Sequence, residues 1–226
     1  MHNNLLDNIF WHALNGSHRV HSMGGDTARR YAPGFPPLVA FAQPEQPDWA
    51  ALAGVCAPGE ALYCGGWSGP APQGWQILVE GLMTRMVWQG ALPDEDTGAD
   101  IVPLGAAHVA QAVALAELTK PGPFGPRNLT LGDYMGCFDN GQLMAMAGER
   151  AFAQPFREVS GVCTHPSQQG RGLARRLVQV VIRRQVQRGE TPFLHVMSSN
   201  LGALGLYQRM GFAAVAQSVV RVVARG

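Results

Sequence analysis

Charged side chains are scarce in this chain of 226 residues, at 15% of the total, and neither sign dominates. The formal net charge is only +1, so no overall electrostatic field would draw the protein to nucleic acid. Hydrophobic residues make up 46% of the chain, which argues against intrinsic disorder and predicts a folded protein with a substantial core. Any site for an anion must therefore be built locally.

Long apolar runs and paired cysteines are also missing. No stretch approaches the roughly 20 residues that a membrane-spanning helix needs, and residues 1–16 lack the basic start and apolar core of a signal peptide. The four cysteines have no close pair, so their spacing fits neither a zinc site nor a disulfide framework. These absences predict a cytoplasmic protein with reduced thiols, no bound metal, and neither membrane nor nucleic acid as a partner.

Composition changes near residue 96, and we expect a boundary there between two parts of the chain. Residues 15–75 are rich in glycine and proline, with a helix expected over 48–55 that Asp48 would cap. The acidic, turn-rich segment ALPDEDTGAD then separates a smaller mixed α/β lobe, residues 1–95, from the more regular residues 96–226. The first lobe would either line the pocket of an acceptor substrate or be a degenerate copy of the second part.

Strands and helices alternate more regularly in the second part, in the order β-α-(α)-β-β-β-α-β-α-β. Asn140-Gly141 is a favoured two-residue hairpin turn, and Gly211 ends a helix. Helices are expected at 106–120, after residue 172, and at 200–210, and strands at 61–64, 75–80, 83–90, 100–105, 134–139, 142–152, 156–165 and 192–199, with one or two more between 212 and 223.

The stretch HPSQQGRGLARRLV, residues 165–178, places Gly170 and Gly172 among arginines at the front of a helix. The first N–H groups of a helix lack intrahelical partners and carry partial positive charge, so they favour a phosphate. Glycine lets such a ligand approach the backbone closely. A tight turn before a solvated helix end explains the loop equally well, and the spacing matches neither the dinucleotide fingerprint nor a P-loop.

Two segments carry a resemblance to a known family. QGRGLA, residues 169–174, matches the Q/R-x-x-G-x-G/A motif of the GCN5-related N-acetyltransferases (GNAT). NLGALGLYQRMGF, residues 200–212, resembles the later segment in which an Asn precedes a helix ending in LY-x-x-x-GF. Residues 99–226 are similar to the FR47-like branch of this family. The resemblance implies an α/β GNAT acetyltransferase fold, a mixed and mostly antiparallel sheet with helices on both faces, with acetyl-CoA as co-substrate and no metal.

The resemblance also implies site residues. The strand at 156–165 would separate from the strand at 192–199, so that the pantetheine arm pairs with its backbone and a strand amide polarises the thioester carbonyl. Asn200 would lie near that arm, and Tyr207 would protonate the departing thiolate, although a packed aromatic is the simpler reading of Tyr207 alone. The implied cofactor-binding residues are Val162, Cys163, Thr164, Gln169, Gly170, Arg171, Gly172, Leu173, Ala174, Asn200 and Tyr207.

The general base is left open by the sequence. An amine is mostly protonated at neutral pH, so a base must remove a proton before attack. Glu158 is the carboxylate on the strand before the motif, whereas many relatives place their Glu nearer Ser160, which lies on the same face. Glu158 would act through a water, or would simply pair with Arg157 or Arg150 at an exposed strand start. Glu149 is a second candidate.

Four other residues, three histidines and one cysteine, are given no catalytic role. His18 and His21 have a spacing that could suit a metal, but a loop pair without metal is favoured because no third ligand is evident. His195 lies in the middle of an expected strand and is interpreted as a core histidine with its hydrogen bonds satisfied. Cys163 adjoins the expected cofactor gap, but a nucleophilic role is disfavoured because the family usually transfers the acyl group directly.

We therefore expect an enzyme that moves acetyl from acetyl-CoA to a primary amine of a small molecule, such as an amino acid, by direct attack in a ternary complex. Two alternatives stay open, namely a non-catalytic acyl-CoA-binding regulatory module and an N-acyltransferase that uses a longer acyl-CoA. The second follows from the likeness to glycine N-acyltransferase-like proteins. The sequence allows a homodimer and does not identify the amine.

Overall fold

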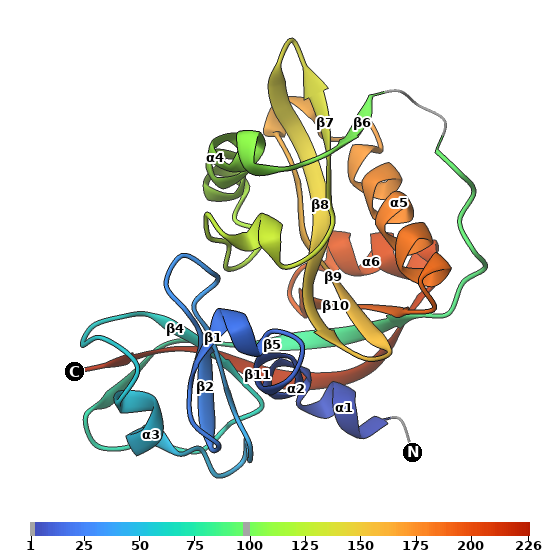
Figure 1. The fold of residues 1–226 in the computed structure, drawn as a ribbon. Coiled ribbons are helices and arrows are strands. Elements are labelled where there is room, and N and C mark those ends of the chain that lie inside the picture. The colour runs from blue at the N-terminus through green and yellow to red at the C-terminus, as the bar shows by residue number, and fades with distance from the viewer. Residues whose placement is uncertain (1–2, 97–99) are drawn as a thin grey trace.

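A computed structural model describes residues 3–96 and 100–226, whose strands form one curled, eleven-stranded sheet (Figure 1). The strand order is β1-β2-β3-β4-β11-β5-β10-β9-β8-β7-β6. Neighbouring strands are antiparallel except for the pairs β3–β4 and β9–β10, which are parallel. The expected fold class, a mixed and mostly antiparallel sheet with helices on both faces, is confirmed.

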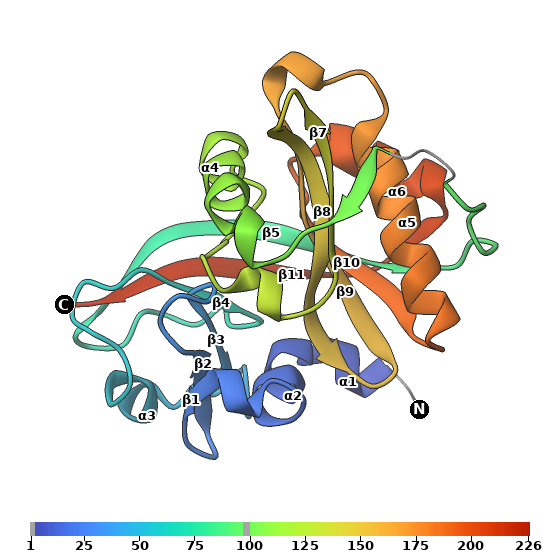
Figure 2. The same ribbon diagram turned by 45° about the horizontal axis from the view of Figure 1, so that its top comes forward.

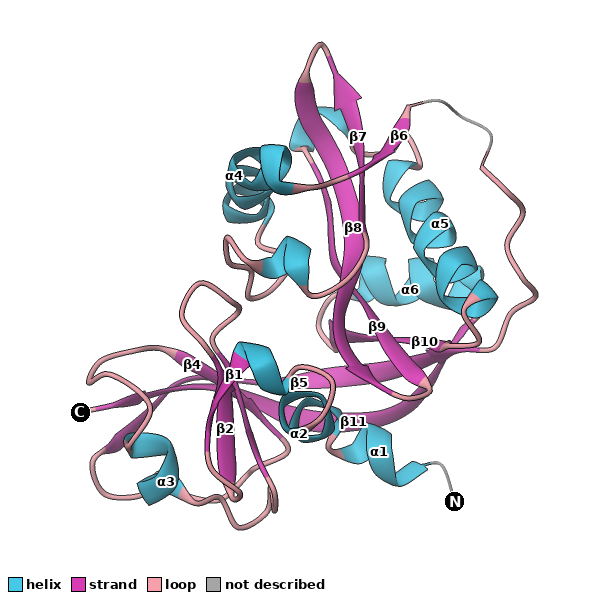
Figure 3. Cartoon of the chain, in the orientation of Figure 1, coloured by secondary structure: helices cyan, strands magenta, loops and turns pink. Residues whose placement is uncertain are grey.

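Figure 3 distinguishes the helices and strands of the chain by colour. The helices are α1 (Asn3–Asp7), α2 (Ile9–Asn15), α3 (Trp49–Ala53), α4 (Val109–Thr119), α5 (Leu173–Gln187) and α6 (Leu201–Met210), with short 3-10 helices η1 (Arg19–His21), η2 (Ala106–His108), η3 (Asn128–Thr130) and η4 (Pro166–Gln168). The strands are β1 (Ser22–Gly24), β2 (Ala28–Tyr31), β3 (Leu38–Phe41), β4 (Leu62–Gly65), β5 (Trp75–Trp88), β6 (Ile101–Pro103), β7 (Tyr134–Asp139), β8 (Gln142–Ala153), β9 (Phe156–Thr164), β10 (Thr191–Met197) and β11 (Phe212–Arg225).

Helices cover both faces of the strands β7 to β10, as Figure 2 shows from a second side. On one face, the apolar side of α5 packs through Leu177, Val178 and Val181 onto the sheet in the largest core cluster. On the opposite face, α4 covers one end of β8 and α2 covers the other. The sheet is therefore enclosed on both sides at the place where the family motif leads into α5.

Strand β5 differs from the sequence-based expectation and explains how the two halves are joined. It is one strand of 14 residues, where two short strands were expected, and the final segment is likewise the single strand β11. β5 pairs with β11 along nearly its whole length and with β10 on its other side. Strand β5, which belongs to the first 95 residues, thus lies between β10 and β11, which belong to residues 96–226. The boundary near residue 96 stays a prediction.

Short sequence patterns predicted a helix cap and a hairpin turn correctly. Asp48 caps α3, because its Oδ1 accepts a hydrogen bond from the Ala51 amide at 2.9 Å. Asn140 and Gly141 have positive φ angles of 48° and 79° and connect β7 to β8, as a two-residue hairpin turn requires. The sequence analysis did not anticipate α1, α2 or the short strands β1 to β3. In the described residues, no helix is both long and apolar enough to cross a membrane.

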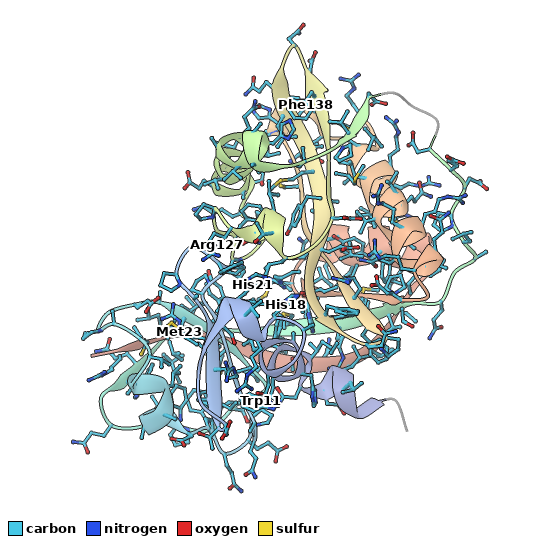
Figure 4. The ribbon with its side chains drawn as sticks, in the orientation of Figure 1. Trp11, His18, His21, Met23, Arg127 and Phe138 are labelled. Atoms are coloured by element: carbon cyan, nitrogen blue, oxygen red, sulfur yellow. The ribbon has the colours of Figure 1, made fainter. Side chains whose placement is uncertain are left out.

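His18 follows α2 and contacts strand β2 of the first lobe. Its side chain lies beside His21 (Figure 4), with ring centroids 6.2 Å apart, and its Nδ1 shares a hydrogen bond of 2.8 Å with the Tyr31 hydroxyl on β2. Burial, together with the charge of Arg157, lowers the pKa of His18 to about 4, while Glu158 opposes the shift. His18 is therefore neutral at physiological pH.

A first prediction concerns the fragment 96–226 expressed alone. Without β5, both β10 and β11 lose an antiparallel neighbour and expose unpaired backbone groups, so the fragment should be insoluble or lack cooperative unfolding. Circular dichroism and thermal melting would measure this. Co-expression with residues 1–95 should restore a soluble complex. A fragment that folds by itself would contradict the shared sheet.

A second prediction concerns His18 and pH. Its folded pKa lies below the ordinary value near 6.5, so its contribution to stability is complete above about pH 6.5 and is lost as pH falls toward 4. Between pH 7.5 and pH 5, this group should lower the free energy of unfolding by about 2 kcal/mol. His18→Asn should flatten the dependence in urea titrations, whereas the control His108→Asn should not. If the free energy of unfolding changed equally with pH in His18→Asn and in wild type, His18 would not be the source of the pH dependence.

Candidate active site

The sheet divides between β9 and β10, which are parallel neighbours only at their beginnings. Their three pairs are Thr191 with Phe156, Pro192 with Arg157, and Phe193 with Glu158. Beyond that point β9 stays paired with β8, and β10 stays paired with β5. The expected separation of these two strands is therefore present, and it begins directly after Glu158.

The glycine loop lies beyond the end of β9 and leads into α5. Gly170 and Gly172 have φ angles of +76° and +77°, a left-handed conformation that favours glycine. Gly172 is the N-cap of α5 and has no side chain to cap it. Within the described residues, no hydrogen bond uses the amides of residues 170–174. Together with the partial positive charge of the helix start, these free amides form a site suited to an anion.

Three arginines beside the loop differ in their contacts. Arg171 contacts the side-chain oxygen of Gln168, and Arg176 is held by Asp96 and Asp100 in ion pairs of 2.9 and 2.8 Å. Arg175 forms no ion pair with any residue that the structure describes, and it lines the neighbouring cleft. A positive charge is thus available at the mouth of the anion site.

A cleft of about 610 Å³ extends from the glycine loop to the end of β9, where β9 is no longer paired with β10. It brings together most of the expected cofactor-binding residues, although Arg171, Asn200 and Tyr207 are not part of its lining. Thr119 at the end of α4 and three residues of α6 also line it, and the sequence analysis did not anticipate them. The lining residues are Thr119, Val162, Cys163, Thr164, Gln168, Gln169, Gly170, Gly172, Leu173, Ala174, Arg175, Gly202, Ala203 and Leu206.

A β-bulge interrupts β9 just before the cleft. The register shifts between the pair Met146–Cys163 and the pair Gly148–Ser160, and Gly161 has a φ of +62°. A Cβ on Gly161 would lie 2.9 Å from the ring of Tyr134, so no larger residue fits there without movement. A bulge leaves backbone groups outside the ladder, and here it does so next to the cleft.

Tyr207 on α6 approaches the cleft from the α5 side of the sheet. Its ring is buried and packs edge-on against Phe212 at 5.8 Å. Burial, with a smaller effect of the neighbouring Cys163, raises the pKa of Tyr207 to about 12. The phenol is therefore protonated at neutral pH and able to donate a proton or a hydrogen bond.

Cys163 lines the cleft as a neutral thiol. Its Sγ donates to the carbonyl oxygen of Gly161 at 3.5 Å. Burial raises the pKa of Cys163 to about 11, and a contact with Thr119 lowers it only in part. Because the thiolate is the nucleophilic form, a thiol of this pKa is a poor acyl acceptor.

Asn200 caps the N-terminus of α6. Its Oδ1 accepts a hydrogen bond from the Ala203 amide at 3.1 Å, which makes it the N-cap of this helix. Its side chain is exposed, and α6 reaches the cleft two residues later at Gly202. The structure therefore places Asn200 beside the cleft as the residue that fixes the start of α6.

Glu158, the first candidate for the base, is fully buried and bound by other parts of the protein. Its two oxygens accept hydrogen bonds from Arg150 at 2.8 and 2.7 Å, from the Ala151 amide at 3.2 Å and from Nδ1 of His195 at 2.8 Å. Burial raises the pKa of Glu158, but the charge and hydrogen bonds of Arg150 outweigh burial and hold the pKa well below its usual range. Glu158 is thus a buried anion rather than an exposed strand-start residue.

Glu149 and Ser160, the other positions considered for the base, differ from Glu158 in their surroundings. Glu149 is buried against the end of α5, where it contacts Arg188 and accepts a hydrogen bond from the Asp133 amide at 3.0 Å. This cluster lies on the α5 face of the sheet. Ser160 is half-buried at the bulge of β9.

Comparison with known proteins identifies the fold. The FR47-like protein family matches residues 134–222. A structure of a GNAT-family acetyltransferase from Novosphingobium aromaticivorans DSM 12444 is 32% identical, covers 98% of each chain and superposes with a TM-score of 0.87. A GCN5-related N-acetyltransferase from Kribbella flavida shares the fold, with 18% identity, coverage of 97% of this chain and 96% of that one, and a TM-score of 0.61.

A curated relative matches over a shorter segment. N-alpha-acetyltransferase RimI of Mycobacterium tuberculosis is 35% identical over 85 residues, which are 36% of this chain and 52% of that protein. The match therefore spans about half the length of this relative. Because the similarity to the Novosphingobium structure extends over nearly all of both chains and the FR47-like match includes both sequence motifs, this chain belongs to the GNAT family of acetyltransferases.

Proposed function

We propose that the protein transfers acetyl from acetyl-CoA to a primary amine of a small molecule by direct attack in a ternary complex. The observation that carries this proposal is the cleft lined by the end of β9, α5 and α6, which includes the glycine loop with its unpartnered amides. These two features suit coenzyme A, whose diphosphate would lie at the glycine loop and whose pantetheine arm would extend along β9.

The chain's residues fit coenzyme A at both ends of the cleft. An added Cβ at Gly170 or Gly172 would meet nothing within 4 Å, so the loop backbone is open to a ligand. We propose that the amides of residues 170–174, with Gln169 and Arg171 beside them, hold the diphosphate. The backbone of residues 162–164 would pair with the pantetheine amides in the manner of an added strand.

Catalysis would rest on a backbone amide of β9 and on the phenol of Tyr207, which lies near Cys163 of the cleft lining. The bound cofactor supplies an acetyl group activated as a thioester. A backbone amide at the β9 bulge would polarise the thioester carbonyl, and Tyr207 would protonate the departing sulfur. We assign Asn200 to the placement of α6, and through it of Tyr207. Holding both reactants in one cleft supplies much of the rate.

The acceptor is proposed to be a small amine, such as an amino acid, that enters from the face of the sheet covered by α2 and α4. The first lobe packs against this face through α2 and is proposed to form part of the acceptor pocket. The cysteines in the described structure are all free, which supports action in a reducing cytoplasm. The relative named N-alpha-acetyltransferase adds a peptide amino terminus to the acceptors worth testing.

Thiol release from acetyl-CoA, measured with free amino acids, polyamines and a short peptide with a free amino terminus, tests the proposal. Turnover with one class of amine would support it and would name the acceptor. Acetyl-CoA binding in calorimetry without turnover would favour a regulatory module. Faster release from propionyl- or benzoyl-CoA than from acetyl-CoA would favour a longer acyl donor.

The substitution Gly172→Glu should lower acetyl-CoA affinity at least about 100-fold in calorimetry. It places a negative charge at the helix start and a side chain at a left-handed position. Gly59→Glu is the matched control, because Gly59 has a φ of +72° and open space around it in the first lobe. Both variants should lose similar stability, but Gly59→Glu should bind acetyl-CoA normally. Normal binding by Gly172→Glu would disprove the diphosphate site.

The substitution Tyr207→Phe should lower kcat by about 100-fold, within the range expected for loss of a proton donor. The ring still packs on Phe212, so acetyl-CoA affinity and melting temperature should stay close to those of wild type. Steady-state kinetics with the best amine of the panel and calorimetry would separate the two effects. An unchanged kcat would assign Tyr207 to packing alone.

A further inference from the structure

His195 occupies the first part of β10 beyond the point where β9 and β10 separate. Phe193 is the last residue of β10 paired with β9, and its partner is Glu158. Two residues further on, His195 would face Ser160 across the opening if the strands had stayed together. His195 therefore lies on β10 at the start of the segment that is not paired with β9, at the level of the bulge at Gly161.

The contact with Glu158 fixes which ring nitrogen carries the proton. Nδ1 lies 2.8 Å from Oε1 of Glu158, an ionised carboxylate that can only accept hydrogen bonds. Nδ1 must therefore be the donor, and in the neutral imidazole Nε2 holds the free lone pair. A carboxylate that orients a histidine in this way also stabilises the imidazolium that forms when Nε2 takes a proton.

Nε2 of His195 is available to a ligand. It has no hydrogen-bond partner among the described residues, and it is not among the buried polar atoms that are sealed from solvent. The side chain as a whole is only 6% exposed, so this exposure is confined to a small part of the ring. A core histidine with both nitrogens satisfied, as the sequence suggested, would not leave Nε2 open.

Neighbouring groups hold the ring and set its charge environment. The ring stacks on Phe10 of α2 at 5.5 Å with an interplanar angle of 26°, and Phe193 packs edge-on against it at 5.5 Å. The charged groups around it are Glu158 on β9, Arg150 on β8, which binds Glu158, and Arg85, the pairing partner of His195 on β5. Arg85 is itself engaged by Asp7 and the Leu6 carbonyl of α1. His18 and Tyr31 also interact electrostatically with Glu158, and Tyr31 with Arg150.

The cofactor and the acceptor would approach from opposite faces of the sheet. The glycine loop leads into α5, which covers one face of the sheet, whereas Glu158, His195 and α2 lie on the other. A base on the α2 face would meet an acceptor that enters opposite the cofactor. Glu149, in contrast, faces the end of α5 and is enclosed by arginines there.

We infer that His195 is the base of the acetyl transfer and that Glu158 is its positioning residue. This inference rests on the proposed function. Nε2 takes one proton from the ammonium form of the acceptor and later gives it to water. The freed nitrogen lone pair forms the C–N bond, and the C–S bond breaks with its electron pair leaving on sulfur. The second nitrogen proton passes to that sulfur, with Tyr207 as the relay.

The substitution His195→Asn tests the inference with the fold preserved. The Asn amide can still donate to Glu158, so the buried carboxylate keeps a partner where Nδ1 stood, but Nε2 is gone. At pH 7, kcat/KM for the best amine of the panel should fall about 100-fold or more, while acetyl-CoA affinity in calorimetry stays unchanged. The deficit should shrink toward high pH, where the amine loses its proton without help. His108→Asn, in η2, is the control and should keep the full rate.

Chemical modification gives a second readout that needs no acceptor. Diethylpyrocarbonate should label His195, as followed by mass spectrometry of its peptide, and acetyl-CoA together with the amine should protect it. An unlabelled His195 would mean that Nε2 is closed and would overturn the inference. So would a His195→Asn variant that is as active as wild type, or one whose rate is reduced equally at every pH. If wild type releases no thiol with any amine, the proposed function itself fails, and the base assignment fails with it.

Discussion

The buried pair of Glu158 and Arg150 is the interaction on which the rest of the site depends. It lies at the last point where β9 and β10 are paired, and it connects β8 and β9 to His195 on β10. Removing one partner of such a pair leaves a buried charge unmatched, which typically costs about 3–5 kcal/mol. The pair therefore stabilises the end of the β9–β10 pairing, and the bulge at Gly161 and the glycine loop follow it along the chain.

Electrostatic organisation in this protein is local. A net charge of +1 provides no long-range attraction for an anionic cofactor. The anion site instead consists of unpartnered amides at the start of α5 with Arg175 at the cleft, and Arg176 is neutralised by Asp96 and Asp100. On the opposite face of the sheet, the negative charge of Glu158 is matched by Arg150. The start of α5 and the Glu158–Arg150 pair thus have separate charge environments on the two faces of one sheet.

The first lobe contributes more than its irregular sequence suggests. β5 completes the sheet between β10 and β11, and α2 covers the face that carries His195. Periodicity did not predict these roles, because α2 is short and β5 alternates only in part between buried and exposed positions. A strand that pairs on both sides is stabilised by its neighbours, so its length depends on contacts far away in the chain.

The sequence by itself determined the features that depend on a few adjacent residues. These include the Asp48 cap, the Asn140-Gly141 turn, the glycine loop before α5 and the family that the two motifs indicate. Only the tertiary structure decided the surroundings of Glu158 and His195. Their partners come from β8, β9, β10 and α2, and whether a carboxylate is open to a substrate or enclosed by an arginine depends on packing between segments distant in sequence. No local pattern carries that information.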